Sequence, residues 1–167
     1  MAQIYETAED LRKERQTMDD VIHQFPGLTP IKLYQFCEVD FALVDNHRTV
    51  DQFVEVKNRK NKIGQYPTLT ISLQKISDAV NLTRFLTKPL VLVIGWTDCI
   101  GTVKITKSLL KSCPVVFNGR TDRPEDPKAL EPQLAIKTSE FKIFTKNLGE
   151  TFLPSREAAK PLSHSAL

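Results

Sequence analysis

Two hydrophobic patterns occur along the chain, one with helical spacing and one made of short continuous apolar runs. Residues 7–25 carry a helical stripe that Thr7 can cap and that Pro26-Gly27 ends. The stripe consists of Leu11, Met18, Val21, Ile22 and Phe25. Residues 70–86 follow a similar pattern and predict a second helix, which ends at Lys88-Pro89.

The apolar runs predict the strands. Strands are expected at residues 31–37, 39–44, 52–57, 89–96 and 101–105, with a turn at residues 45–48. The 89–96 run is almost wholly apolar, which is typical of a central strand covered on both faces. The order helix, strands, helix, strand, strand predicts an α/β fold in which helices flank a mixed β-sheet.

The last third of the chain gives weaker patterns. Residues 115–118 and 134–144 are predicted to form short strands or helices, and residues 120–132 a loop rich in Pro, Asp and Arg. Apolar residues are scarce from residue 153 onward, so a disordered tail is expected there. The sequence therefore predicts one domain over residues 1–152 and a tail over residues 153–167.

The composition favours an intracellular globular protein. Hydrophobic residues make up 41% and charged residues 26% of the chain. No run approaches the length of apolar sequence that spans a membrane, and the N-terminus lacks an apolar signal core. The three cysteines have no metal-binding spacing and are expected to be reduced thiols. We therefore expect a cytoplasmic or nucleoid-associated protein with no membrane partner.

Charge is distributed unevenly between the two parts of the chain. Residues 1–55 hold five Lys/Arg and eleven Asp/Glu, a balance of −6, whereas residues 56–167 hold eighteen and nine, a balance of +9. Basic residues crowd together directly after the changeover, at Lys57, Arg59, Lys60 and Lys62. This segment could bind a polyanion and bring one phosphate to the acidic residues, or it could be a solvated loop.

Charged residues also interrupt two apolar strands. Glu55 and Lys57 share one face of the 52–57 strand, and Asp40 opens the apolar 39–44 run. If the two strands pair as a hairpin, Asp40 comes close to Glu55. Two carboxylates and an ammonium at the edge of a sheet could bind a hard divalent cation and support phosphodiester hydrolysis. The alternative is an ordinary Glu–Lys surface pair on an edge strand.

Asp40, fourteen intervening residues and then Glu55-Val56-Lys57 form a motif that resembles the PD-(D/E)xK nuclease superfamily, which includes resolvase-like and RecB-like domains. The resemblance covers residues 7–105 and also rests on the order of the predicted elements. A second Glu-x-Lys triplet, Glu140-Phe141-Lys142, lacks this context. Val39 precedes Asp40 where the motif name has proline, and a shifted register would make Glu38 the acid instead.

The resemblance implies a restriction-endonuclease-like fold and a role for each residue of the motif. Asp40 and Glu55 would ligate Mg²⁺ or Mn²⁺ together with the Val56 carbonyl, and Lys57 would orient the attacking water or help to deprotonate it. Glu14 matches an inward acid on the first helix of resolvase-like and RecB-like members and could be a further metal ligand, although a surface role for Glu14 is an alternative.

Further residues are expected to contact nucleic acid. They are Arg59, Lys60, Lys62, Gln74 and Lys75, of which Gln74 and Lys75 could instead lie on a solvated helix face. Tyr66, after the basic segment, could stack on a base or anchor the loop.

The expected function is a Mg²⁺-dependent nuclease that hydrolyses DNA, either structure-specific or processing, in recombination or repair. Cleavage of a branched substrate would require a homodimer. Two alternatives stay open: a non-catalytic nucleic-acid-binding or assembly protein with a nuclease-like sheet, and an RNA endonuclease.

Overall fold

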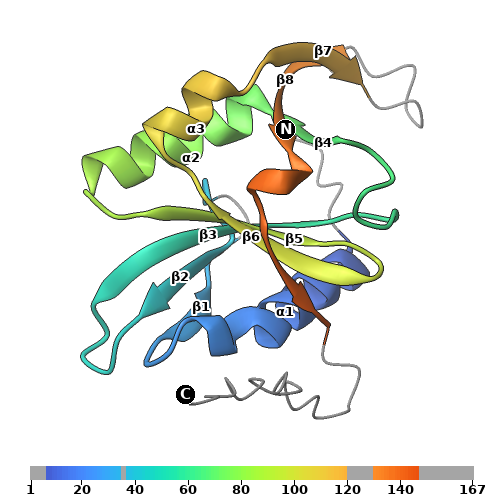
Figure 1. Ribbon diagram of the computed structural model, residues 1–167. Helices are drawn as coiled ribbons and strands as arrows, with labels where there is room; N and C mark the ends of the chain where they lie inside the picture. The colour runs from blue at the N-terminus through green and yellow to red at the C-terminus, as the bar shows by residue number, and fades with distance from the viewer. Residues whose placement is uncertain (1–6, 35–36, 120–129, 147–167) are drawn as a thin grey trace, which may run out of the picture.

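The computed structural model describes residues 7–34, 37–119 and 130–146, which form two β-sheets and the helices packed on them (Figure 1). The helices are α1 (Ala8–Val21), α2 (Leu73–Phe85) and α3 (Lys107–Ser112), with 3₁₀ turns at Ile22–Gln24 and Thr138–Glu140. The strands are β1 (Thr29–Lys32), β2 (Phe41–Val44), β3 (Val50–Asn58), β4 (Thr68–Ser72), β5 (Leu90–Gly95), β6 (Cys99–Lys104), β7 (Val115–Gly119), β8 (Leu130–Lys137) and β9 (Lys142–Thr145).

The larger sheet has the strand order β1-β2-β3-β5-β6-β9, and the smaller sheet the order β4-β8-β7. In the larger sheet β3 and β5 are parallel and the other neighbours antiparallel. The crossover between β3 and β5 contains β4 and α2, as parallel strands require a long connection. The predicted mixed α/β sheet with flanking helices is confirmed.

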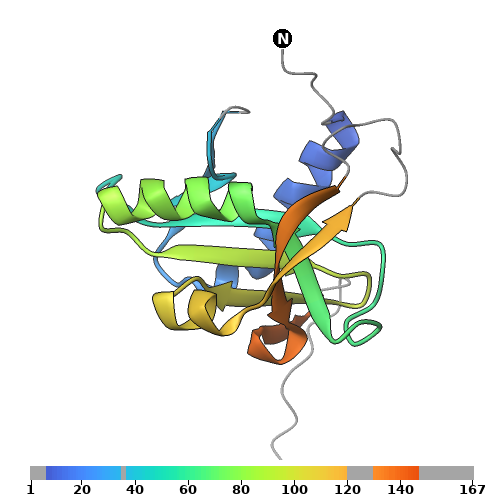
Figure 2. The same cartoon turned by 90° about the horizontal axis from the view of Figure 1, so that it is seen from above.

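The larger sheet lies between two layers. Helix α1 covers one face, while α2, α3 and the small sheet cover the other (Figures 1 and 2). Met18 and Val21 of α1 pack with Val91 and Val93 of β5, whereas Leu92 and other residues of β5 face the opposite core. Because both faces of β5 are buried, its sequence is continuously apolar.

The first helix begins as predicted. Thr7 and Asp10 form a reciprocal cap in which Asp10 N–H donates to Thr7 Oγ1 at 3.1 Å and Thr7 N–H to Asp10 Oδ2 at 3.0 Å. The α-helix ends at Val21 rather than at residue 25. Leu11 is 38% exposed, and Glu14 lies on the buried face of the helix instead.

The predicted helix over residues 70–86 was wrong at its start. Thr68–Ser72 form β4, and Ser72 caps α2 through its hydroxyl, which accepts a hydrogen bond from Lys75 N–H. The strand forms because Thr70 and Ile71 pair with Ala135 and Leu134 of β8, more than sixty residues later. A partner so distant leaves no local signal in the sequence.

Other boundaries also differ from the expectations. The strand expected at residues 31–37 is β1, which starts at Thr29 and ends at Lys32, and the one expected at 39–44 starts at Phe41. Helix α3 was not predicted, and residues 130–132 of the predicted loop belong to β8. Residues 120–129 of that loop and the tail over residues 153–167 lie outside the described residues. Within the described ranges, no helix has the length and apolar character needed to cross a bilayer.

Gly95 at the end of β5 permits close packing of α1 against the sheet. A Cβ at this position would overlap Asn58 Oδ1 and lie 2.9 Å from Thr17 Oγ1, two atoms that hydrogen-bond to each other at 2.7 Å. We expect Gly95→Ala to lower the free energy of unfolding by about 1–3 kcal/mol in urea denaturation. Ser77→Ala on the exposed face of α2 should change it by less than about 0.5 kcal/mol. Equal midpoints for the two variants would contradict this packing.

Candidate active site

The hairpin of β2 and β3 brings Asp40 next to Glu55. Phe41 pairs with Val54 in an antiparallel register, and Asp40 N–H donates to the Val54 carbonyl at 3.0 Å. Asp40 N–H therefore bonds the carbonyl of the same Val54 that lies opposite Phe41, so two residues of this strand face one residue of β3 and the regular ladder stops at Asp40. The hairpin expected from the sequence is therefore present.

Glu55 is a fully buried carboxylate held between two lysines. Its exposed fraction is 0%, and its Oε1 lies 2.8 Å from Lys57 Nζ while its Oε2 lies 3.3 Å from Lys75 Nζ. Burial raises the pKa of Glu55 to about 6, with Asp40 adding to the rise and the two lysines opposing it. Both oxygens are removed from solvent, and neither receives a well-oriented hydrogen bond from the described residues.

Lys57 is surrounded by acidic groups. Burial by itself would lower its pKa, but Glu55, Asp40 and Glu14 together raise the pKa above its ordinary value. The ammonium form of Lys57 is therefore stabilised by the same carboxylates that its charge neutralises.

Asp40 lies where β2 stops pairing with β3. Its Oδ2 accepts the Val56 N–H at 2.8 Å, so a side chain replaces the next ladder bond of the sheet. The N–H and C=O groups of one strand residue point to the same side, so the Val56 carbonyl also faces the side of β3 on which Asp40 lies. The Asp40 carboxylate and the Val56 carbonyl thus lie on the same side of β3, where β2 begins.

A third lysine, Lys32 of β1, connects α1 to this group. Its Nζ lies 2.9 Å from Glu14 Oε2 and 3.5 Å from Asp40 Oδ1. Glu14 is 8% exposed, so the inward orientation expected for it is observed. Sequence reasoning missed Lys32, since a single lysine in a short strand gives no signal until the register with β2 is known.

The other expected contact residues take different positions. Lys75 reaches Glu55, whereas Gln74 donates to Asp78 Oδ1 at 2.7 Å on the exposed face of α2 and does not join the group. Lys60 and Lys62 are exposed. Arg59 is half-buried, and its Nη2 donates a hydrogen bond to the Thr70 carbonyl at 2.7 Å.

Glu38 and the second Glu-x-Lys triplet lie elsewhere. Glu38 is exposed and, among the described residues, forms no ion pair with the lysines of the site, unlike Asp40. Glu140 ends the 3₁₀ turn Thr138–Glu140 and Lys142 begins β9, and both are exposed.

A groove of about 520 Å³ adjoins the two lysines of Glu55. Its walls come from the ends of β3 and β4, the start of α2 and the small sheet. They include Lys57, Arg59, Ser72, Lys75, Glu131 and Gln133. The groove gives an extended ligand access to the side of the buried carboxylate where Lys57 and Lys75 lie.

The carboxylate and carbonyl oxygens near the start of β2 are ligands of the type that a hard divalent cation prefers. Within the described segments, no three His, Cys, Asp or Glu side chains form a ready-made ligand group. Mg²⁺ needs fewer protein ligands than that, because it retains several waters and binds through one or two carboxylates. Glu55 supports this fit, because its two solvent-shielded oxygens receive no well-oriented hydrogen bond from the described residues.

Comparison with known proteins gives a family and a structural likeness. The family model described as "Phage putative PDDEXK endonuclease" matches residues 1–144. No curated protein matches the chain. The Holliday junction resolvase Hjc of the archaeal hyperthermophile Archaeoglobus fulgidus is similar in structure, with 15% sequence identity and a TM-score of 0.47 over 77% of this chain and 87% of that one. A likeness this low assigns no activity. The family match spans most of the chain and includes Asp40, Glu55 and Lys57, and the chain therefore belongs to the PDDEXK endonuclease family.

Proposed function

We propose that this protein is a Mg²⁺-dependent endonuclease that hydrolyses phosphodiester bonds in DNA. The observation that carries the proposal is the buried Glu55 carboxylate, which lies near Asp40 and whose two lysine partners, Lys57 and Lys75, line a basic groove. A fully buried carboxylate is costly unless its charge is used or compensated. Family membership supports nuclease chemistry at this position.

The residues of the proposed site have three roles: metal binding, orientation of the attacking water and charge compensation. Asp40, Glu55 and the Val56 carbonyl would hold Mg²⁺ or Mn²⁺, which when bound supplies positive charge to the scissile phosphate and lowers the pKa of water. Lys57, held as an ammonium by the neighbouring carboxylates, would orient the attacking water. Lys75 and Lys32 offset the negative charge of Glu55 and Asp40, and Glu14 fixes Lys32 in place.

Divalent cations are expected to stabilise the folded protein. Mg²⁺ or Mn²⁺ at about a hundred times its Kd should raise the free energy of unfolding by about 2.7 kcal/mol, because only the folded state assembles the site. Thermal unfolding with and without the ion measures the effect, and Asp40→Asn should abolish it. A matched change at an exposed acid, Glu140→Gln, should leave it intact. If neither Mg²⁺ nor Mn²⁺ changed the melting temperature of the wild-type protein, the result would contradict the proposed ligands.

Lys60 and Lys62 are expected to contact phosphates beyond the site. Both are exposed and follow β3 directly, so they can bind a backbone that extends past the groove. We expect Lys60→Ala with Lys62→Ala to weaken DNA binding at all sequences and to reduce the slope of log K against log salt by about 2. Fluorescence anisotropy over a salt series measures this. A wild-type slope in the double variant would place the DNA elsewhere.

A cleavage panel tests the function itself. Branched, linear duplex and single-stranded DNA and the equivalent RNAs are incubated with Mg²⁺, Mn²⁺ or chelator. We expect cleavage of DNA that requires the metal, as for a nuclease of recombination or repair that acts in the cytoplasm or nucleoid. Binding without cleavage under either metal would favour a non-catalytic assembly protein, and cleavage restricted to RNA would favour an RNA endonuclease. Paired cuts in a branched DNA would support a homodimer.

A further inference from the structure

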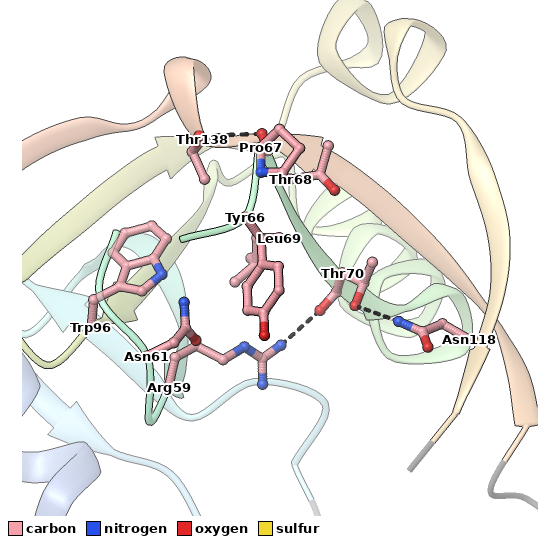
Figure 3. Close-up of a pocket in the computed structure, with 10 residues that line it drawn as sticks. All are labelled: Arg59, Asn61, Tyr66, Pro67, Thr68, Leu69, Thr70, Trp96, Asn118 and Thr138. Atoms are coloured by element: carbon pink, nitrogen blue, oxygen red, sulfur yellow. Dashed lines mark hydrogen bonds between the residues drawn. The ribbon is translucent and has the colours of Figure 1, made fainter. Parts of the chain in front are cut away.

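A second cavity, of about 370 Å³, opens beside the groove between the end of β3 and strand β4 (Figure 3). It is lined by Arg59, Asn61, Tyr66, Thr70, Trp96 and Asn118, among others. Arg59, Thr70 and Asn118 line the groove next to Lys57 as well, so the two spaces share one wall. We propose that this cavity binds one unpaired nucleobase of the substrate, next to the phosphate that is cut. The proposal rests on the proposed function for the identity of the ligand.

The aromatic residues give the cavity a stacking surface. The ring of Tyr66 stands in the middle of it, between Trp96 on one side and Thr70 on the other (Figure 3), and Tyr66 is 57% exposed. Trp96 is 2% exposed and meets Phe141 edge-to-face with centroids 5.3 Å apart, so its indole is a fixed wall. A flat base can cover the exposed Tyr66 ring, since every base has a π-face.

Arg59 gives the cavity an uncompensated cation at the end nearest the active site. Its guanidinium is tied to the Thr70 carbonyl, and in the described part of the chain no carboxylate lies within ion-pair distance of it. Partial burial of Arg59 lowers its pKa, because the charged guanidinium has less access to water. A phosphate here would restore the missing counter-charge, and the guanidinium fork matches phosphate oxygens.

The size and polarity of the cavity favour a single base over a base pair. Its volume is at the lower end of the range of small-molecule sites, about 300–1,000 Å³. Amide groups of Asn61 and Asn118 line it and can meet the polar edge of a base that has left its partner. The substrate class that fits is DNA with an unpaired nucleotide beside the cut, as occurs at a bulge, flap or junction.

The test is a binding measurement without cleavage. Wild-type protein in chelator is titrated against a short fluorescent duplex and the same duplex with one unpaired 2-aminopurine, followed by anisotropy and by 2-aminopurine fluorescence. We expect Tyr66→Ala to weaken binding of the unpaired probe by about tenfold and to abolish the fluorescence change, with duplex binding unaltered. Tyr66→Phe should retain both signals. Phe85→Ala, which removes an aromatic ring 86% exposed on α2, serves as the matched control.

Loss of affinity for both probes alike in Tyr66→Ala, or no loss for either, would overturn the base-binding cavity. Either result leaves cleavage by Asp40, Glu55 and Lys57 untouched. Conversely, a protein that cuts no nucleic acid yet shows the Tyr66-dependent preference would end the nuclease assignment and keep the cavity.

Discussion

Glu55→Gln is expected to reduce the rate of DNA cleavage by about 10³-fold, since a metal ligand contributes several kcal/mol of transition-state stabilisation. DNA binding in chelator should be nearly unchanged, because the phosphate contacts lie on other residues. Stabilisation by Mg²⁺ should be lost together with cleavage. Single-turnover rates, anisotropy and thermal unfolding measure the three effects separately.

The second Glu-x-Lys triplet supplies the control for this change. Glu140→Gln alters the same residue type with the same Glu-x-Lys spacing but at an exposed position, and this variant should cleave as the wild type does. Removing the charge of Glu55 leaves Lys57 and Lys75 without their partner, and breaking a buried pair costs about 3–5 kcal/mol. The same three measurements are therefore also made on Asp40→Asn, which changes a less buried carboxylate than Glu55→Gln does. Wild-type cleavage by either folded variant would refute the active site proposed here.

Lys57→Met is expected to lower the cleavage rate by about 10²–10⁴-fold with Mg²⁺ binding retained. The lysine acts on the attacking water, a role that contributes about that much, whereas the metal ligands are oxygens on other residues. Cleavage rates and the Mg²⁺-induced rise in melting temperature should therefore separate in this variant, although both are lost in Glu55→Gln. This contrast distinguishes a residue that positions the water from one that holds the ion.

Lys142→Met, in the second triplet, is the matched control and should change neither measurement. A Lys57→Met protein that no longer responds to Mg²⁺ would show that Lys57 mainly maintains the shape of the site. A Lys57→Met protein that cleaves at the wild-type rate would remove Lys57 from the reaction altogether.

The motif itself was predictable because its geometry is local. Side chains alternate along a strand, so Glu55 and Lys57 must share a face of β3 once that strand forms. A short turn joins β2 to β3, so the hairpin that brings Asp40 near Glu55 is equally local. The continuously apolar sequence of β5 likewise predicted that this strand is central in the sheet.

The partners of these residues were not predictable, because they come from elements far apart in the chain. Lys32 meets Glu14 and Asp40 only when β1 pairs with β2 under α1, and Lys75 meets Glu55 only when α2 covers β3. Gln74, its neighbour, stays a predicted nucleic-acid contact, and the turn of the helix directs it towards Asp78 on the exposed face instead of towards Glu55.

The cavity beside the site depends on contacts that are more distant still. Strand β4 exists because β8 offers it a pairing edge, and that pairing places the Thr70 carbonyl where it can hold Arg59. By itself the sequence determined which charged residues stand on one strand face and in one hairpin, since backbone periodicity fixes those relations. Only the tertiary structure decided which lysines neutralise the acids and where an aromatic cavity opens, since packing sets the distances between separate elements.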